Sequence, residues 1–256
     1  MKVTIITTTY NREQTLDCTI QSVYNQSYKN IEYIIVDGAS TDNTLEIIKK
    51  NEHLFNGRLK WISEPDKGLY DALNKGIQMA TGDIIGILHS DDFFTEDNII
   101  EQIVSVFHNN KEYDALYGDV HYVKSENLNK CIRYYSSKIF KPQLMRLGFI
   151  PAHPTFYMKK ECYNQFGGYK TNYKIAADFE FLLRVILNRR IKTKYLPLDM
   201  VTMRTQGLST SGWKSHWIIM NEHLRACREN NVYTNIFLLS LRYFYKVIEI
   251  FFYKLF

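Results

Sequence analysis

The sequence lacks the two common nucleotide-binding fingerprints of α/β proteins. No GxGxxG follows the first apolar run, and no GxxxxGK[ST] occurs in the 256 residues, which argues against a Rossmann-type dinucleotide site and against a P-loop. Proline is scarce, at 5 residues, and no Pro-rich or Gly/Ser-rich linker interrupts the chain. We therefore expect one large domain, or one domain with an appendage, rather than a string of modules.

The 4 cysteines form no CxxC pair and no metal-finger spacing. We expect them to be reduced thiols, as in cytosolic proteins. The first residues, MKVTIITTTYN, become polar too early for a secretory signal and are typical of a first strand. Both observations predict a protein on the cytoplasmic side of the membrane.

The chain does contain an alternation of short apolar runs with amphipathic segments. Alternating strands and helices, with strands that are apolar on both faces, predict an α/β fold with a mostly parallel sheet flanked by helices. The predicted strands are Lys2–Thr7, Ile31–Val36, Leu59–Ser63 and Ile84–Leu88, and helices are predicted over Gln14–Asn25 and Leu69–Ala80.

Acidic residues stand at the ends of these predicted strands. Asp37 follows the second strand, and the pair Asp91 and Asp92 follows the fourth. In open α/β sheets the ligand crevice lies outside the carboxyl ends of the strands, so we expect these carboxylates to converge there. Their oxygens suit Mg²⁺ or Mn²⁺, which usually arrive with phosphates. The alternative is that the pair simply begins the next helix, as aspartates often do.

Five motifs follow one another along the chain: TTTYN, VDGASTDNT, EPDKGLYDALNKGIQMATGD, an apolar strand into SDD, and AADFEFLLR. In this order the chain resembles the family 2 inverting glycosyltransferases of the GT-A fold, of the type that makes bacterial cell-surface polysaccharides. The resemblance covers residues 1–211, which predicts a glycosyltransferase domain there. Residues 212–256 lie outside it and are expected to form a helical segment that associates with the membrane.

The resemblance implies a nucleotide-sugar donor, usually a UDP-sugar. Thr8 and Tyr10 match the loop that packs on the nucleobase, and Asp37 matches the carboxylate that hydrogen-bonds the base or the ribose. Asp71 matches an acidic position that helps to hold the nucleotide. Asp91 belongs to the same donor site through the diphosphate.

The resemblance also implies a divalent metal, Mn²⁺ or Mg²⁺, and a general base. Asp91 and Asp92 match the acidic motif that binds the metal and the diphosphate, and Asp178 matches the base. Inverting transfer needs a cation beside the leaving diphosphate and a carboxylate that deprotonates the acceptor hydroxyl. It needs no second carboxylic acid for the leaving group, unlike glycoside hydrolysis.

Three positions depart from the family pattern. Gly38 stands where many members have a second acid after the second strand. His89 replaces the first Asp of the metal motif; it suits Mn²⁺ better than Mg²⁺, or contacts the donor instead. Ala177 precedes Asp178 where a Glu is usual, which leaves Glu180 as a competing base.

The last segment, 235–256, is very apolar but carries Arg242, Lys246 and Glu249 along one stripe. A spanning helix has few charges, so the pattern predicts an amphipathic helix in the membrane interface. This would hold the enzyme on the inner face of the cell membrane, where the resemblance implies a saccharide acceptor carried on polyprenyl diphosphate. The alternatives are packing on the protein's own body or on a second copy in a homodimer. No nucleic acid is expected, because the aromatics lie in an apolar helix rather than a stacking groove.

Two other functions stay open. A sugar nucleotidyltransferase would share the sheet and the metal, but it should carry a Gly-rich loop with Lys or Arg where Thr7-Thr8-Thr9-Tyr10 stands. A non-catalytic, membrane-bound scaffold would have kept the fold and lost the metal site. His89 favours the scaffold, whereas Asp91 and Asp178 oppose it.

Overall fold

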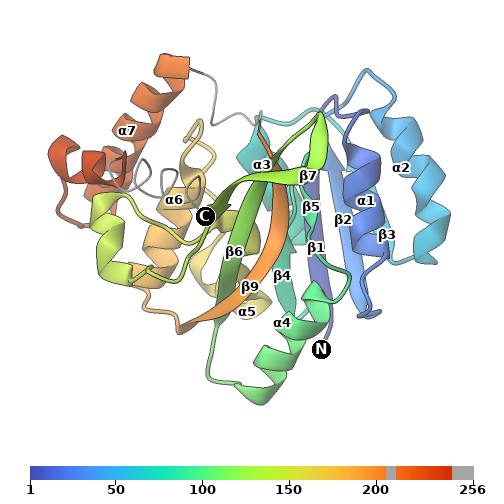
Figure 1. Ribbon diagram of the computed structural model, residues 1–256, viewed down its shortest axis with the longest axis horizontal. Coiled ribbons are helices and arrows are strands. Elements are labelled where there is room, and N and C mark those ends of the chain that lie inside the picture. The colour runs from blue at the N-terminus through green and yellow to red at the C-terminus, as the bar shows by residue number, and fades with distance from the viewer. Residues whose placement is uncertain (206–211, 244–256) are drawn as a thin grey trace.

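The computed structural model describes residues 1–205 and 212–243 (Figure 1). These residues form a nine-stranded sheet with helices on both faces. The strands are β1 (Val3–Thr9), β2 (Ile31–Asp37), β3 (Leu59–Ser63), β4 (Ile84–Ile87), β5 (Phe93–Phe94), β6 (Ala115–Lys124), β7 (Asn127–Tyr135), β8 (Tyr157–Lys159) and β9 (Thr193–Arg204). The α-helices are α1 (Leu16–Tyr24), α2 (Thr44–Glu52), α3 (Leu69–Met79), α4 (Ile99–Asn109), α5 (Lys160–Phe166), α6 (Ala177–Leu182) and α7 (Gly212–Glu229). Shorter helical turns are η1 (His53–Phe55), η2 (Pro142–Leu147), η3 (His153–Thr155) and the π-helical η4 (Leu183–Asn188).

The strand order is β3-β2-β1-β4-β8-β6-β9-β5, and β7 pairs with β6. The first four strands of this order are parallel, as predicted from their apolar sequences. Beyond β4 the sheet is mixed, because β8 runs antiparallel to both β4 and β6 while β6 and β9 run parallel. The predicted α/β architecture is confirmed, and the parallel half contains the predicted strand ends.

The parallel strands are buried on both faces, since alternate side chains point to opposite sides of a strand. On one face Ile6 packs in a cluster with residues of α3, α5, α6 and α7. On the other face Ile5 packs with residues of α1, α2 and α4. Every residue of β1 and β2 is buried, which explains why their sequences are mostly apolar or β-branched rather than alternating.

The stretch 122–140 carried no clear sequence signal, and the structure shows why a strand forms there. β6 extends to Lys124 because it pairs with β9 on one side and with β7 on the other. Partner strands supply these hydrogen bonds, so the strand does not depend on a strong local pattern. β6 and β7 thus form a hairpin within the same sheet (Figure 1).

The C-terminal segment packs on the body as far as it is described. On α7, Ala226 and Cys227 are buried against the core around α6. A further helix begins at residue 236, and its Leu239 is buried, while Ile236 and Phe237 are 54% and 71% exposed. Within residues 1–205 and 212–243, no helix combines the length and apolarity that crossing a bilayer requires. The predicted apolar face from residue 244 onward, with Lys246 and Glu249, lies outside the described residues.

Candidate functional site

The parallel register brings three loops together at one edge of the sheet. Thr9 at the end of β1 pairs with Asp37 at the end of β2. The segment after β4 lies along the other side of β1, because the Leu88 N–H donates to the Ile6 carbonyl at 3.0 Å and the Thr7 hydroxyl donates to the Leu88 carbonyl at 2.7 Å. The ends of β1, β2 and β4 are therefore neighbours at the edge where the sequence predicted that Asp37, Asp91 and Asp92 converge.

The loop after β1 presents the two predicted base-contacting residues in different ways. Tyr10 is 59% exposed, so its ring is available as a stacking surface. Thr8 and the adjacent Thr9 are buried, and within the described part of the chain neither hydroxyl has a hydrogen-bond partner. Buried polar atoms are usually satisfied, so a pair without partners next to an open loop indicates that a ligand or water completes them.

Asp37 is completely buried and holds the loop that follows β2. Its carboxylate accepts hydrogen bonds from the Ser40 backbone N–H at 3.0 Å, from the Ser40 hydroxyl at 2.5 Å and from the Ser63 hydroxyl at 2.6 Å. Asn11 completes the arrangement by accepting from the Thr41 backbone N–H at 2.9 Å. Asp37 thus fixes the geometry of the loop at the predicted nucleotide position.

Gly38, which departs from the family pattern, lies against an acid supplied by another loop. A Cβ at Gly38 would stand only 2.7 Å from Asp66 Oδ2 and 3.4 Å from the Tyr10 ring. The carboxylate of Asp66 therefore occupies the space that a second acid at position 38 would enter. Sequence reasoning missed Asp66, although it lies in the EPDKG motif that carried the resemblance.

Asp71 supports the same turn. Its carboxylate accepts from the Lys67 backbone N–H at 3.0 Å and lies 3.8 Å from the Lys75 ammonium group. Gly68 precedes the helix with a φ of 114°, a conformation that favours glycine. The predicted donor residue Asp71 thus acts in this structure on the turn that carries Asp66.

The two aspartates after β4 differ in their surroundings. Asp92 is 2% exposed, and its burial, together with the charge of Asp91, raises its pKa well above the usual range against the opposing effect of Arg204. Asp91 is only half-buried, and its backbone carbonyl accepts from Arg204 Nη1 at 2.5 Å. Asp91 is therefore the more accessible carboxylate for a ligand. Arg204 belongs to β9, so its hydrogen bond to the Asp91 carbonyl connects this loop to β9.

No group of three or more metal-ligating side chains gathers within the described residues. This does not oppose a metal bound together with a substrate, because Mg²⁺ sites often use one or two carboxylates plus substrate phosphates and waters. Asp91, with His89 two residues earlier, is an oxygen and nitrogen donor set that fits Mn²⁺.

The predicted base, Asp178, lies beside two histidines. Asp178 Oδ2 is 3.5 Å from His153 Nδ1, and the rings of His153 and His89 are 5.7 Å apart. Burial raises the pKa of Asp178 to about 6, because its charged form loses water, and the backbone N–H of Phe179 opposes this shift. Burial lowers the pKa of His89 and of His153 to about 4. Near pH 7 an ionised carboxylate therefore faces two neutral imidazoles.

Glu180, the competing base, is committed elsewhere. It is completely buried and pairs with Arg184 at 3.2 Å and with Lys170 at 3.0 Å. Asn230 donates to it at 3.3 Å. Asp178 is 25% exposed and free of such an ion pair among the described residues. Between the two candidates, the geometry favours Asp178.

The segment before α6 is held by a residue that sequence reasoning missed. Glu222 of α7 is buried and accepts hydrogen bonds from the backbone N–H groups of Lys174, Ile175 and Ala176 at 2.6, 3.0 and 2.8 Å. From the other side, the Tyr70 hydroxyl donates to the Ile175 carbonyl. His153 was also missed, and its only sequence signal was the loop Pro151-Ala152-His153-Pro154.

Comparison with known proteins identifies the family of the chain. The sequence pattern described as Glycosyl transferase family 2 matches residues 4–163, more than half of the chain. A PGL/p-HBAD biosynthesis glycosyltransferase of Mycobacterium bovis is 28% identical over 193 residues, 75% of this chain and 72% of that protein. A glycosyltransferase of Mycobacterium tuberculosis is 32% identical over 187 residues, 72% of this chain and 69% of its own length.

Solved structures share the fold at low identity. S. aureus TarS 1–349 in complex with UDP-GlcNAc has a TM-score of 0.69 and 17% identity, covering 91% of this chain and 68% of that one. The mannosyltransferase PcManGT of Pyrobaculum calidifontis, in complex with GDP-Man and Mn²⁺, has a TM-score of 0.63 and 20% identity, covering 87% and 61%. The chain spans 41% of a longer TarS structure. These likenesses confirm the predicted GT-A fold, and with the family match they show that the chain is a glycosyltransferase of glycosyl transferase family 2.

Proposed function

We propose that this glycosyltransferase moves a sugar from a UDP-sugar to an acceptor hydroxyl with inversion at the anomeric carbon, using a divalent metal. The observation that carries the proposal is Asp178, a 25% exposed carboxylate beside His89 and His153, with its pKa raised to about 6. A general base is most effective when its pKa lies near the working pH while it is still ionised. Asp178 meets both conditions at pH 7.

The chemical step follows from the position of this base. As the acceptor oxygen forms a bond to the anomeric carbon, its proton moves to Asp178 and the bond to the donor diphosphate breaks on the opposite face. The neutral imidazoles of His89 and His153 lie near Asp178 without adding a positive charge that would lower its basicity. The two substrates must be held in line, which is where most of the rate gain from binding arises.

The donor would lie across the ends of β1, β2 and β4. Tyr10 offers a stacking face, and the unpartnered hydroxyls of Thr8 and Thr9 offer hydrogen bonds. Asp37 and Asp71 hold the loops around this position. The complex of TarS 1–349 with UDP-GlcNAc supports a uridine nucleotide, although GDP-Man in PcManGT shows that this fold also accepts guanosine donors.

The donor's diphosphate would lie next to the half-buried Asp91. Asp92 is buried below this position, and Arg204 holds the Asp91 backbone carbonyl. A bound Mn²⁺ or Mg²⁺ would neutralise the charge that develops on the leaving diphosphate. The Mn²⁺ in the PcManGT complex supports this choice. Asp91 is the residue expected to hold the ion, and His89 is expected to contact either the ion or the donor.

The acceptor is proposed to be a saccharide on a polyprenyl diphosphate at the inner face of the membrane. The exposed Ile236 and Phe237 at the start of the last helix support peripheral membrane contact, since neighbouring exposed apolar residues favour an interface. Hydrolysis of UDP-sugars with and without Mn²⁺ tests the proposed donor and the proposed metal, because UDP should be released only from a donor that the enzyme uses and faster with the metal.

The central test compares Asp178→Asn with Glu180→Gln. Asp178→Asn should lower kcat by roughly 10²–10⁴-fold with donor affinity unchanged, because it removes the proton acceptor and leaves the donor site intact. Glu180→Gln should mainly lower stability, because it leaves Lys170 and Arg184 without their buried partner. If Glu180→Gln shows the catalytic loss and Asp178→Asn does not, the assignment of the base is wrong.

A further inference from the structure

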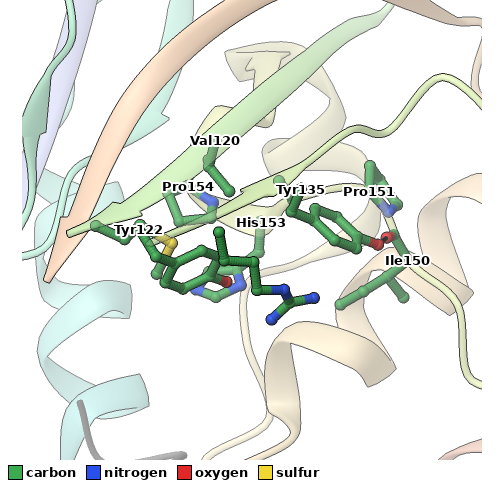
Figure 2. A pocket seen from close by; sticks show the side chains of 10 residues that line it. Val120, Tyr122, Tyr135, Ile150, Pro151, His153 and Pro154 are labelled. Carbon is green, nitrogen blue, oxygen red and sulfur yellow. Dashed lines mark hydrogen bonds between the residues drawn. The ribbon is translucent and has the colours of Figure 1, made fainter. Parts of the chain in front are cut away.

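His153, which contacts Asp178 at 3.5 Å, also lines a cavity of about 150 Å³ between the β6–β7 hairpin and the loop 150–154 (Figure 2). The described residues that line this cavity include none from α6 or α7. α6, which carries Asp178, also packs against α7 (Figure 1). The contact between these two helices is a second support for the base.

One residue of α7, His223, lies face to face with the residue that follows the base. The ring centroids of His223 and Phe179 are 3.8 Å apart, and the ring planes differ by 8°. Both side chains are buried, with exposed fractions of 5% and 0%. Protein interiors are close-packed, so two parallel rings in contact have little freedom to tilt. His223 therefore fixes the orientation of Phe179.

Phe179 acts on the Asp178 carboxylate through its backbone. Burial raises the pKa of Asp178 to about 6, and the hydrogen bond from the Phe179 N–H opposes a further rise. A hydrogen bond to the charged form of a carboxyl group lowers its pKa, so a displacement of Phe179 would change both the position and the basicity of the carboxylate. His223 can thus act on the base through Phe179.

His223 is held in turn by a residue of the last helix. Arg242 Nη1 lies 2.7 Å from His223 Nδ1, and a guanidinium has only donors, so the ring nitrogen accepts and the imidazole is neutral. Burial, together with the charge of Arg242, lowers the pKa of His223 well below its usual range. Donation from a cation withdraws electron density from the imidazole, which makes its face less negative and favours stacking on the Phe179 ring.

Arg242 is itself fixed by its surroundings. Its Nη2 donates to the Tyr243 hydroxyl at 3.2 Å, and the guanidinium lies over the Tyr243 ring at 5.0 Å. Gly148, with a φ of 81°, approaches so closely that a Cβ there would stand 2.9 Å from Arg242 Cδ. Leu239, three residues earlier on the helix, is completely buried. A continuous chain of contacts therefore leads from the last helix to the base.

We propose that His223 is a positioning residue for Asp178 and that Arg242, from the last helix, holds His223 in place. The proposal rests on the role of Asp178 proposed above and adds a requirement, because the last helix must be docked for the base to be placed. The helix that exposes Ile236 and Phe237 is therefore also the helix that sets the base.

The first measurement needs neither donor nor acceptor. The pKa of Asp178 is read from the NMR shifts of carboxyl carbons in aspartate-labelled protein, and the spectrum of Asp178→Asn identifies its signal. His223→Gln keeps an acceptor for Arg242 but lacks the ring, His223→Phe keeps a ring beside Phe179 but accepts nothing, and Arg242→Met removes the cation. Cys227→Ala is the matched control, because Cys227 is completely buried on the same helix, one turn from His223.

The titratable groups that act on Asp178 from the elements around it are unchanged in these variants. Among the described residues they are His89, His153, Tyr70, Tyr169 and Glu222. A change in the pKa of Asp178 therefore reports on the position of Phe179.

His223→Gln should raise the pKa of Asp178 by roughly half a pH unit or more, because Phe179 loses its ring partner and its N–H moves off the carboxylate. His223→Phe and the half-buried Arg242→Met should each give a smaller rise. Cys227→Ala should lower the melting temperature without moving the pKa. The proposal is overturned if neither His223→Gln nor Arg242→Met moves the pKa, or if His223→Phe or Cys227→Ala raises it as much as His223→Gln does.

Hydrolysis of UDP-glucose, UDP-galactose and UDP-N-acetylglucosamine with Mn²⁺ is then measured on the same proteins. His223→Gln and Arg242→Met should lower kcat by roughly tenfold and leave the donor KM unchanged, because a misplaced base slows the chemical step and neither residue belongs to the donor loops. A shifted pKa with an unchanged kcat would show that His223 positions Asp178 but that Asp178 is not the base. If the wild type releases no UDP from any of these donors, the proposed donor class fails, while the pKa comparison still decides whether His223 positions Asp178.

Discussion

His153 Nδ1 lies 3.5 Å from Asp178 Oδ2, and this contact joins the loop before β8 to the start of α6. Both imidazoles near Asp178 are neutral at pH 7 because burial lowers the pKa of His153 and of His89 to about 4. The Asp178 carboxylate therefore has two imidazoles nearby, and neither supplies a positive charge. An ionised carboxylate that is buried without a cationic partner lowers the stability of the folded state. The same burial raises the pKa of the carboxyl, which a catalytic base needs.

The raised pKa of Asp178 predicts opposite pH effects on activity and on stability. Activity should rise with pH through about 6, because the base must be ionised. The folded-state pKa of about 6 exceeds the unfolded value near 4, so ionisation disfavours folding, and this penalty grows as the pH rises from about 4 to 6. Asp178→Asn should therefore be more stable than wild type at pH 8, by on the order of 1–3 kcal/mol.

Urea denaturation at pH 8 and at pH 4 measures this directly. The stability difference between Asp178→Asn and the wild type should shrink to about 0.4 kcal/mol at pH 4, where the carboxyl is protonated in the folded state and about half protonated in the unfolded state. A variant that is less stable than the wild type at pH 8 would show that Asp178 is held by favourable contacts and has no raised pKa.

Substitutions of Asp91 and of Asp92 should have different effects on metal-dependent binding of the donor. Asp91→Asn should remove Mn²⁺-dependent binding of UDP-sugar and leave the melting temperature unchanged, because Asp91 is half-buried at the loop surface. Asp92→Asn should also reduce transfer but lose less metal-dependent binding, because Asp92 is 2% exposed and its raised pKa favours the neutral form. Calorimetric titration of the donor with and without Mn²⁺ measures both effects. An equal or larger loss for Asp92→Asn would make Asp92 the principal ligand.

Glu222→Gln should lower kcat without changing the KM of the donor, because Glu222 positions the segment before α6. A Gln offers only one oxygen to the three N–H groups of Lys174, Ile175 and Ala176, and leaving buried donors without a partner costs about 1–3 kcal/mol. The charge of Glu222 also contributes to the raised pKa of Asp178, so the acid limb of the pH–rate profile should move to lower pH.

Glu229→Gln on the same helix is the matched control. Glu229 pairs with Lys170 and Arg225, so its loss should lower stability. It should leave the acid limb in place, because Glu229 makes no hydrogen bond to the 174–176 segment within the described structure. If both variants shift the limb equally, Glu222 acts only through general stability.

The start of the last helix allows a test of membrane contact that leaves the core intact. Replacing both Ile236 and Phe237 by Ser should reduce co-sedimentation with anionic liposomes and leave the melting temperature unchanged, since these side chains are 54% and 71% exposed. Leu239→Ser should instead destabilise the protein by about 2–5 kcal/mol, because Leu239 is completely buried.

Deletion of residues 235–256 should release the protein from liposomes and spare donor hydrolysis, but it also removes Leu239 and the contact of Arg242 with His223 at 2.7 Å. The point variants avoid this loss of packing. Liposome binding that persists in the Ile236 and Phe237 double variant would place the membrane contact elsewhere or make the helix purely structural.

Much of this arrangement is readable from the chain. The apolar runs of β1, β2 and β4 determine a parallel sheet buried on both faces, and the rule that ligands lie at carboxyl ends places Asp37 and Asp91 at the site. The sequence predicts only the start of β6, at Ala115–Tyr117, and gives no clear prediction for residues 122–140, because the rest of the hairpin depends on partners that are distant in the sequence and carries a weak local pattern.

The sequence by itself determined the fold class and the motifs that resemble family 2, since both follow from local periodicity and spacing. Only the tertiary structure decided that Glu180 is bound by Arg184 and Lys170 while Asp178 opens toward His153. It also decided that Asp66 fills the space beside Gly38. Glu180 and Arg184 are four residues apart on one helical stretch, so their pairing is local. The other contacts join side chains on separate elements, and a side chain's partner and exposure there depend on packing that no local pattern encodes.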